Sequence, residues 1–206
     1  MHPTSHQVRS PLTTLHRCSA LVLAVFVAVH LLNHAVLVVD PAAAFAFMDN
    51  ARQVYRWLPV EALVLACVAV QMATGLLLAR RLPGSTPGAR ATRISAYYLL
   101  FFLAVHLGAV FWGRHGLQLD TNIHFAAAGL HAWPSAAFFV PYYFLAVLAV
   151  FVHLGLAAGR YLSKGKRAAP LLAGAVGAVL SALIVAAMAG VGNGLQIPAA
   201  YLRAVA

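Results

Sequence analysis

The chain has 206 residues, of which 63% are hydrophobic and only 9% are charged, and its formal net charge is +10. Its mean hydropathy of +0.85 excludes an ordinary soluble domain, because a soluble core must still be wrapped in polar residues. The sequence therefore predicts an all-α, polytopic membrane helical bundle. The distribution of the basic residues, given below, argues against a nucleic-acid partner.

Five stretches are long enough to cross a bilayer as helices, which takes about 20 apolar residues each. These transmembrane helices are expected at residues 18–39, 60–79, 94–112, 142–161 and 171–191. Residues 1–16 are predicted to form a cytoplasmic N-terminal arm, and residues 17–206 a single transmembrane bundle domain. The first stretch is longer than the roughly 7–15 apolar residues of a signal peptide, so we expect this helix to be retained.

The connections between the stretches also carry structural signals. Pro41 ends the first stretch, because proline cannot continue a helix. Residues 42–57 mix apolar and charged side chains and are expected to form a short interfacial helix on the outer surface. Residues 113–141 are too apolar for a loose loop and predict an outer cap over the bundle. The last stretch, with Gly174 and Gly177, lacks ionisable groups and is expected to be a closely packed scaffold helix.

The basic residues give the expected orientation. Most of the 14 lysines and arginines fall on one side of the membrane in the expected topology. This pattern predicts a cytoplasmic N-terminus and a C-terminus outside, in a multi-pass protein of a bacterial-type inner (cytoplasmic) membrane. The basic segments would contact anionic lipid headgroups or a cytoplasmic partner. The residues on that side are Arg9, Arg17, Arg80, Arg81, Arg90, Arg93, Arg160, Lys164, Lys166 and Arg167.

Four histidines fall inside the expected helices, where hydrocarbon cannot solvate an ionisable side chain. Neutral imidazole is also a common ligand of haem iron. His30 and His106 each lie thirteen residues beyond an arginine at the cytoplasmic end, Arg17 and Arg93, so they are expected at matching depth. His153 is expected about 9 Å closer to the cytoplasm. The fourth is His34.

Matching depth suits two axial ligands on opposite faces of one haem b, so His30 and His106 are the candidate ligands of the iron. His153 is a further candidate, as a ligand of a second haem, a propionate partner or part of a quinone pocket. His34 lies one turn beyond His30 on the same face, as an alternative ligand, a propionate partner or a quinone-binding group. Arg17 is expected to anchor the helix at the headgroups, or with Ser19 to hold a quinone carbonyl. No catalytic residue is expected.

Four short motifs carry a resemblance to a known family. They are His16-Arg17-Cys18-Ser19-Ala20, Ala28-Val29-His30-Leu31, Phe101-Phe102-Leu103-Ala104-Val105-His106-Leu107, and Phe151-Val152-His153-Leu154-Gly155. At these residues the chain resembles the cytochrome b membrane-anchor subunits of succinate dehydrogenase and fumarate reductase. It is most similar to the five-helix, single-chain kind that carries two haems.

The resemblance implies haem b, a membrane quinone as substrate, and cytoplasmic flavoprotein and iron–sulfur subunits as partners. It implies an electron-transfer subunit of an oxidoreductase rather than a complete enzyme. The sequence departs from the family at one position. Where the second-helix ligand would precede Arg80-Arg81-Leu82-Pro83, the chain has Thr74, and a hydroxyl does not usually ligate haem iron. One haem is therefore expected, with two as the alternative.

Two other classes of function stay open. The first is a cofactor-free scaffold or transport protein, in which the histidines join helices or carry protons. The second is a non-haem metal hydroxylase of the membrane, suggested by the His30-x-x-x-His34 spacing, although no further histidine cluster follows it. Spectroscopy separates the first class from a cytochrome. His115, His124 and His131 are expected to be solvated or interfacial.

Overall fold

The computed structural model describes residues 10–162 and 168–205, and within these ranges it contains helices and no strands. Five helices are long and apolar enough to cross a membrane. The predicted all-α polytopic bundle with five transmembrane helices is therefore confirmed. The five are α1 (Pro11–Val39), α3 (Leu58–Arg81), α4 (Pro87–Phe111), α6 (Ser135–Gly159) and α7 (Ala168–Met188).

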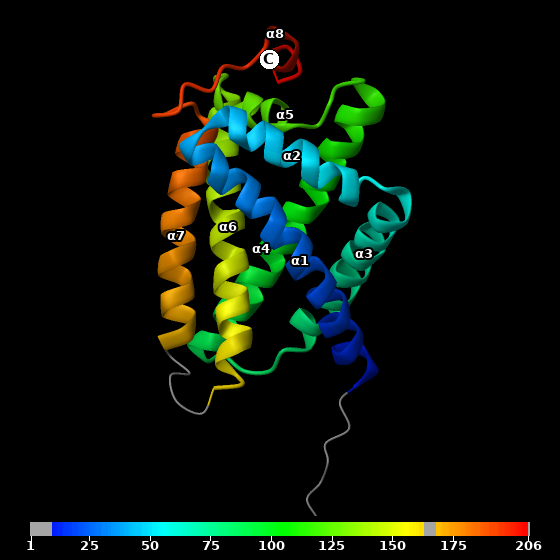
Figure 1. The fold of residues 1–206 in the computed structure, drawn as a ribbon. Coiled ribbons are helices and arrows are strands. Elements are labelled where there is room, and N and C mark those ends of the chain that lie inside the picture. Colours follow the sequence, from blue (N-terminus) through cyan, green and yellow to red (C-terminus); the bar gives the residue numbers. More distant parts are fainter. Residues whose placement is uncertain (1–9, 163–167, 206) are drawn as a thin grey trace, which may run out of the picture.

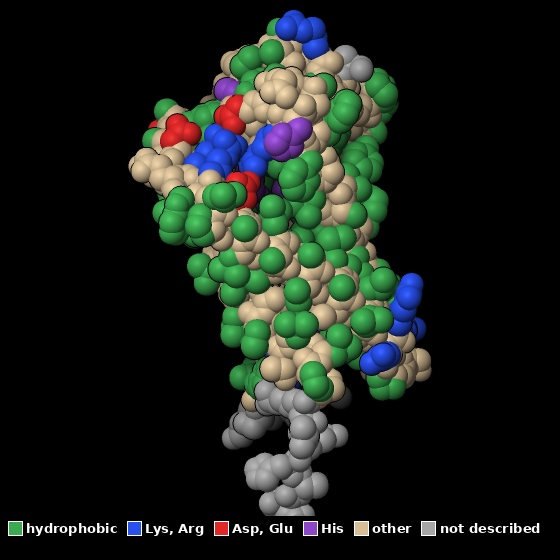
Figure 2. Space-filling model, turned by 90° about the vertical axis from the view of Figure 1, so that its right-hand side faces the viewer, with side chains coloured by type: hydrophobic (Ala, Val, Ile, Leu, Met, Phe, Trp, Pro, Cys, Tyr) green, Lys and Arg blue, Asp and Glu red, His purple; other side chains and the backbone are tan. Residues whose placement is uncertain are grey.

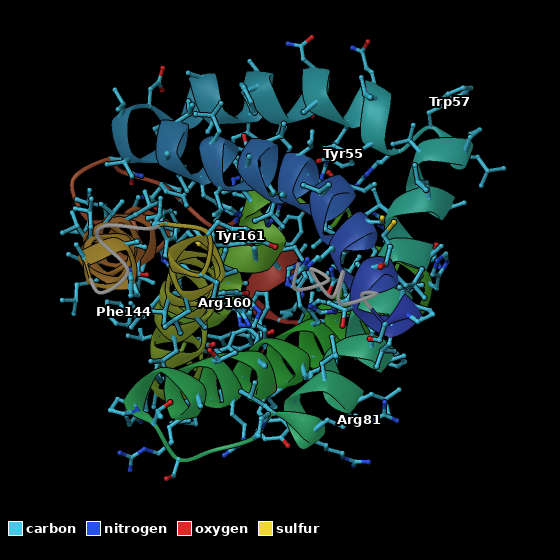
Figure 3. All side chains as sticks on the ribbon, turned by 90° about the horizontal axis from the view of Figure 1, so that it is seen from below. Tyr55, Trp57, Arg81, Phe144, Arg160 and Tyr161 are labelled. Carbon is cyan, nitrogen blue, oxygen red and sulfur yellow. The ribbon has the colours of Figure 1, made fainter. Side chains whose placement is uncertain are left out.

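The five long helices form a closed ring. Among the described residues, α1 packs on α3, α3 on α4, α4 on α6, α6 on α7, and α7 again on α1. Helices on opposite sides of the ring, such as α1 and α4, do not pack closely on each other. Seen along the bundle, the helices surround a central region into which side chains project (Figure 3). The interior of the ring therefore contains side chains, and the backbones of helices on opposite sides are not in close contact.

Helix α1 begins seven residues earlier than expected. Ser10 caps it by accepting a hydrogen bond from the Thr13 amide, and Pro11 takes the first helical position, where its missing N–H costs nothing. Residues 11–16, expected in the N-terminal arm, therefore belong to the helix. The expectation counted only the apolar run, but polar residues in a first turn do not stop a helix. Residues 1–9 of the expected arm lie outside the described residues.

A second helix, α2 (Pro41–Tyr55), lies across one end of the ring, as Figure 1 shows. Asp40 ends α1 and caps α2, because its carboxylate accepts a hydrogen bond from the Ala42 amide at 2.8 Å. Helix α2 occupies most of the segment expected to form an interfacial helix. The end of the molecule that carries α2 is the one that the charge pattern predicts to be outside, and it is called the outer end below.

The segment expected as an outer cap also lies at the outer end. It contains the π-helical turn η1 (Trp112–Gly116), α5 (Ile123–Ala127) and the 3₁₀ turn η2 (Ala128–Leu130). Its last residues, however, belong to α6, which begins at Ser135 rather than at residue 142. The expected boundary was set by Pro141, but this proline lies inside the helix. Membrane helices tolerate such a residue because neighbouring groups can satisfy the freed carbonyl.

Helix α7 ends at Met188, three residues before the expected end. Gly190 has a positive φ of 77°, and the Val191 amide donates to the Ala186 carbonyl at 2.9 Å, which together form a Schellman stop. The chain then turns back over the outer end. There the Asn193 side chain donates to the Leu37 carbonyl at 2.8 Å, and α8 (Ala199–Leu202) follows.

The fully buried apolar core is concentrated toward the outer end. Its residues come from α1, α2, α5, η2, α6, α7 and the segment after α7, so it seals the cap onto the ring. The core consists of Leu37, Ala44, Met48, Ile123, Ala127, Leu130, Val147, Ile184, Ala187, Met188 and Leu195.

The outward faces of the long helices are apolar. Side chains such as Leu21 and Leu171 are 71% and 74% exposed, which suits contact with lipid tails and not with water. Figure 2 shows this surface as a broad band of hydrophobic side chains below a group of charged ones. Trp57, Trp112 and Trp133 are exposed near the outer helix ends, as expected for residues at headgroup level. Contact with membrane lipid follows from this surface.

Helices α6 and α7 approach each other most closely at glycines. A Cβ added to Gly177 would lie 2.6 Å from the Phe151 Cβ, and one added to Gly155 would lie 2.6 Å from the Ala173 Cβ. The expected close packing is therefore confirmed at Gly177. At Gly174 the nearest atom would be 3.6 Å away, an ordinary contact.

Candidate functional site

Three histidine side chains meet in the interior of the ring. His30 and His34 come from α1, and their ring centroids are 4.9 Å apart. His106 comes from α4, on the opposite side of the ring, and its centroid lies 6.1 Å from that of His30. The structure thus brings together the two residues that counting from Arg17 and Arg93 placed at the same depth. We call His30, His34 and His106 the outer histidine cluster.

Aromatic rings hold two of these imidazoles in place. Phe26 stacks on His30 with centroids 5.8 Å apart, and Phe102 stacks on His106 at 5.1 Å. Both partners lie one helical turn before the histidine that they contact, so the helical repeat itself creates the pairs. The stacking fixes the ring planes without using the nitrogen atoms. The nitrogens therefore stay available for a ligand.

Hydrogen bonding supports the same conclusion. Within the described residues, neither His30 nor His106 makes a side-chain hydrogen bond, and the Nδ1 atom of His34 is buried with no partner. Buried polar groups are normally paired, so unpaired imidazoles inside a membrane bundle indicate a missing partner. His30 and His106 are also only partly buried, so protein atoms do not fill all of the space around them.

The His30 and His106 rings, with centroids 6.1 Å and planes 71° apart, have a separation that can be compared with that of two imidazoles on one metal ion. With metal–nitrogen bonds of about 2 Å, two imidazoles on opposite sides of one ion have ring centroids about 6 Å apart. Among residues 10–162 and 168–205, no group of three or more histidine, cysteine and acidic side chains is placed to hold a metal ion. A pair of ligands suffices only for an ion whose other ligands come from the cofactor itself, as a porphyrin provides them.

His153 lies elsewhere, in a second group near the opposite end of the bundle, which the charge pattern predicts to be cytoplasmic and which is called the cytoplasmic end below. Its Nδ1 atom is 3.0 Å from the Ser95 Oγ of α4. In the same region, His16 of α1 places its Nδ1 2.8 Å from the Thr74 Oγ1 of α3. Thr74 is the residue that stands where the resemblance would place a histidine. We call His16, Thr74, Ser95 and His153 the inner histidine cluster.

His16 was not predicted as a site residue. It was expected in the N-terminal arm, outside the bundle, because the first helix was expected to begin at residue 18. The signal was present in Ser10 and Pro11, a typical helix start about two turns before residue 18. With the helix begun there, His16 lies on a membrane helix and reaches α3.

The predicted quinone ligands lie beside the inner histidine cluster. The Ser19 hydroxyl donates to the Leu15 and His16 carbonyls at 2.9 and 3.2 Å, so it is already engaged within α1. The Arg17 guanidinium lies over the Tyr161 ring, 5.6 Å from its centroid, and its Nη1 atom is buried with no hydrogen-bond partner among the described residues. Tyr161 and Arg160 appear near the middle of the bundle when it is viewed from below in Figure 3. The Arg17 side chain is therefore turned toward the opening of the helix ring at the cytoplasmic end, which is called the bundle mouth below.

A groove of about 380 Å³ opens between the cytoplasmic ends of α3, α4 and α6. Leu82, Thr92 and Leu156 line it, with Arg160 at one side. It combines an apolar wall with a single cationic group, which suits an amphipathic molecule with a polar head.

Charged residues at the outer end pair with each other. Asp120 contacts Arg52 at 2.9 Å and Arg56 at 3.2 Å, and Arg114 pairs with Glu61. Partial burial alone would raise the pKa of the Asp120 carboxyl, but the hydrogen bonds and charges of the two arginines outweigh it and hold the pKa below the usual value. The charged group in the upper part of Figure 2 shows these opposite charges side by side.

The sequence contains four carboxylates, and all of them belong to the segments at the outer end: Asp40, Asp49, Glu61 and Asp120. The arginines at the cytoplasmic end therefore have no side-chain carboxylate in the chain to neutralise them.

Two histidines of the outer cap, His124 and His131, make contacts within the protein. His131 places its Nε2 2.8 Å from the Met188 carbonyl, and His124 packs between Phe45 and Tyr201. Burial lowers the pKa of the His124 imidazole, because it disfavours the charged form. These contacts agree with the interfacial role expected for His124 and His131.

No protein-family model, curated protein or solved structure matches this chain. The resemblance to the cytochrome b anchors therefore depends on local motifs alone. The chemistry that the site could support must therefore be inferred from its own residues. These are unpaired imidazoles in the outer histidine cluster, a second imidazole group near the cytoplasmic end, and guanidinium groups at the bundle mouth.

Proposed function

We propose that this chain is a membrane-embedded b-type cytochrome that passes electrons between the quinone pool and a partner protein, with a haem b held by His30 and His106. The observation that carries the proposal is the pair of facing imidazoles, 6.1 Å apart between centroids, on two helices that do not pack closely on each other. Neither imidazole makes a side-chain hydrogen bond among the described residues that would explain its presence in a membrane interior.

When bound, haem b takes up and releases single electrons. The chain's own residues would tune that exchange. His30 and His106 would hold the haem iron through their imidazole nitrogens, Phe26 and Phe102 fix the planes of these two rings, and the apolar core would keep water from the outer end of the site.

Electrons would enter or leave through a quinone at the cytoplasmic end. The groove beside Arg160 offers an apolar wall with a cation, and the unpaired Nη1 of Arg17 can donate to a quinone oxygen. Ser19 is a weaker candidate than the sequence suggested, because its hydroxyl already donates within α1. The basic cytoplasmic end would also suit docking of flavoprotein and iron–sulfur subunits in a bacterial-type inner membrane.

A cofactor-free scaffold or transport protein is the second candidate. The hydrogen bonds between His16 and Thr74 and between His153 and Ser95 favour it, because each joins two helices. The unpaired nitrogens of His30, His34 and His106 argue against it, because a scaffold gains nothing from unsatisfied imidazoles.

The experiment is to purify the chain from membranes grown with added haem precursor. Oxidised and dithionite-reduced absorption spectra and the pyridine haemochrome are then recorded. A b-type α band that falls in both His30→Ala and His106→Ala supports the proposal. His115→Ala is the matched control, because that imidazole is exposed at the outer end and should leave the band unchanged. A colourless wild-type protein would overturn the proposal in favour of the scaffold.

A further inference from the structure

Two tyrosines join α4 and α6 by reciprocal hydrogen bonds. The Tyr98 hydroxyl of α4 donates to the Tyr142 carbonyl of α6 at 2.8 Å, and the Tyr142 hydroxyl donates to the Phe102 carbonyl of α4 at 3.1 Å. Tyr142 is only 4% exposed, and a buried tyrosine hydroxyl normally needs such a partner. Since one bond holds its backbone and the other its side chain, the position of Tyr142 against α4 is fixed at two points.

The Tyr142 ring packs on Phe102, the residue that stacks on His106. The centroids of the Tyr142 and Phe102 rings are 4.9 Å apart, with the ring planes at 33°. Phe102 in turn lies nearly parallel to the His106 imidazole, at 15° and 5.1 Å. Among the described residues, the ring contacts of Tyr142 do not include His106 itself. An effect of Tyr142 on this imidazole must therefore pass through Phe102.

The Tyr142 hydroxyl also binds the helical turn that carries both rings. In an α-helix the amide of residue i donates to the carbonyl of residue i−4, so the Phe102 carbonyl is the backbone acceptor of His106 within α4. The same carbonyl accepts the hydrogen bond of the Tyr142 hydroxyl. Tyr142 thus contacts both the backbone and the phenyl ring of the turn that ends at His106.

The facing imidazole of His30 is supported by the same order of residues. Phe26 stacks on His30 from one turn earlier in α1, at 5.8 Å and 16°. Tyr55 of α2 meets the Phe26 ring edge-on, with centroids 5.6 Å apart. On both sides of the ring interior, a tyrosine from another helix packs against a phenylalanine, and the phenylalanine stacks on the imidazole. The repetition indicates that the support of the two imidazoles is a property of the site.

We infer that Tyr142 positions the His106 imidazole by holding Phe102 against it. A phenylalanine without such a neighbour can change rotamer about two bonds, whereas one held by packing keeps the ring beside it oriented. Among the described residues, His106 makes no side-chain hydrogen bond that would fix it instead. The value of this orientation for haem binding rests on the proposed function, but the contact of Tyr142 with Phe102 does not.

The orientation can be measured without haem. In the full chain purified from cells that make no haem and labelled with ¹³C at histidine, the Cε1 signal of His106 is assigned by its loss in His106→Ala. The ring current of the stacked Phe102 shifts this signal, so Phe102→Leu gives the value of an unstacked imidazole. Tyr142→Leu should move the signal toward that value. Tyr143→Leu is the matched control, because the Tyr143 hydroxyl binds the Ala126 carbonyl of the outer cap, and it should leave the signal unchanged.

A smaller substitution keeps the test decisive. If Tyr142→Leu does not fold, Tyr142→Phe replaces it, because this variant keeps the ring and removes only the hydroxyl that anchors it. A smaller movement of the His106 signal in the same direction supports the inference. A signal at the wild-type position in a folded variant overturns it.

The haem-loaded chain gives a second measurement, the rate at which haem transfers to excess apomyoglobin. Groups that orient a metal ligand typically change metal affinity by about 10–100-fold, so Tyr142→Leu should release haem about tenfold faster than the wild type. Added to Phe102→Leu, it should cause no further increase, because its effect passes through that residue. Added to Phe26→Leu, which acts on the other imidazole, it should multiply the rate. A general loss of stability would multiply the rate in both backgrounds, and that result overturns the inference.

These outcomes separate the inference from the proposed function. A wild-type chain that takes up no haem overturns the proposed function, and the His106 signal then decides the role of Tyr142 alone. A chain that binds haem, and whose Tyr142→Leu variant releases it at the wild-type rate, overturns the inference and leaves the cytochrome standing. If the haem-free chain does not fold, the release rates decide.

Discussion

The imidazole of His34 stands edge-on to that of His30, with the ring planes 84° apart and the centroids 4.9 Å apart. The two residues are one helical turn apart, so their contact follows from the helical repeat. His34 therefore lies beside the facing pair of His30 and His106, as a neighbour of the proposed haem. Its buried Nδ1 has no hydrogen-bond partner in the part of the chain that the structure describes.

The first prediction concerns this neighbour. His34→Leu should keep the haem content of the wild-type chain, because the facing pair of imidazoles is intact. It should raise the midpoint potential, because a more apolar surrounding disfavours the extra charge of the ferric form. A redox titration followed at the α band measures this. Loss of the band as complete as in His30→Ala would show instead that His34 is a ligand.

The second prediction concerns Asp120, whose carboxylate joins Arg52 and Arg56 of α2 to the outer cap. Asp120→Asn should destabilise the detergent-solubilised protein by about 1 kcal/mol, because partly exposed ion pairs each contribute a fraction of that. Thermal unfolding followed by circular dichroism measures the change. Asp49→Asn is the control, because Asp49 is 69% exposed and 4.0 Å from Arg52, and it should have little effect.

The same pair of proteins gives a pH dependence. The pKa of Asp120 is lowered from 3.8 in the folded state, so its stabilising contribution is present above that value. The contribution is lost as the pH falls through the lowered pKa. The difference in melting temperature between the wild type and Asp120→Asn should therefore be constant from about pH 8 to 5 and shrink below about pH 4. A difference that shrinks near neutral pH would contradict this assignment.

The third prediction tests the stop of α7. Gly190→Ala should destabilise the protein by about 1–2 kcal/mol, because the φ of 77° is strained for any residue with a Cβ. The new Cβ would also lie 3.0 Å from the Leu195 carbonyl oxygen. Gly108→Ala is the control, since that helical position has open space around it, and it should be neutral or slightly stabilising. Equal melting temperatures for the wild type, Gly190→Ala and Gly108→Ala would contradict the proposed role of Gly190.

The fourth prediction tests the contact between α6 and α7. In Gly155→Ala the new methyl group would lie 2.6 Å from the Ala173 Cβ and 3.0 Å from the Pro170 Cα, so α7 must shift. The expected cost is about 1–3 kcal/mol, typical of overpacking. Gly174→Ala on the facing helix meets only Val152 Cγ2 at 3.6 Å and should be tolerated. Unfolding in a denaturing detergent ranks the two variants, and the opposite order would refute this packing.

Hydropathy predicted the five membrane helices because each apolar run is long, and residue counting predicted that His30 and His106 would meet. The helix ends were less predictable, because they depend on local geometry. Pro41 ends a helix, as expected, whereas Pro141 lies inside one. Gly190 stops α7 through a positive φ that an apolar pattern does not reveal.

The inner histidine cluster could not be predicted from the sequence, for a different reason. His16 and Thr74 are 58 residues apart, and only the packing of α1 on α3 brings them within 2.8 Å. A local motif gives no information on such a pair. The replacement at position 74 was visible in the sequence, but the residue that contacts it was not.

The closed ring of helices has a consequence for biosynthesis. The contact that closes it joins α1 and α7, the first and the last of the five long helices to leave the ribosome. Until α7 is inserted, the four earlier helices form an open row, and the surfaces of α1 and α6 that α7 later covers face lipid. Any large group destined for the interior can enter sideways during this interval. Once α7 is in place, the same passage requires helices to separate.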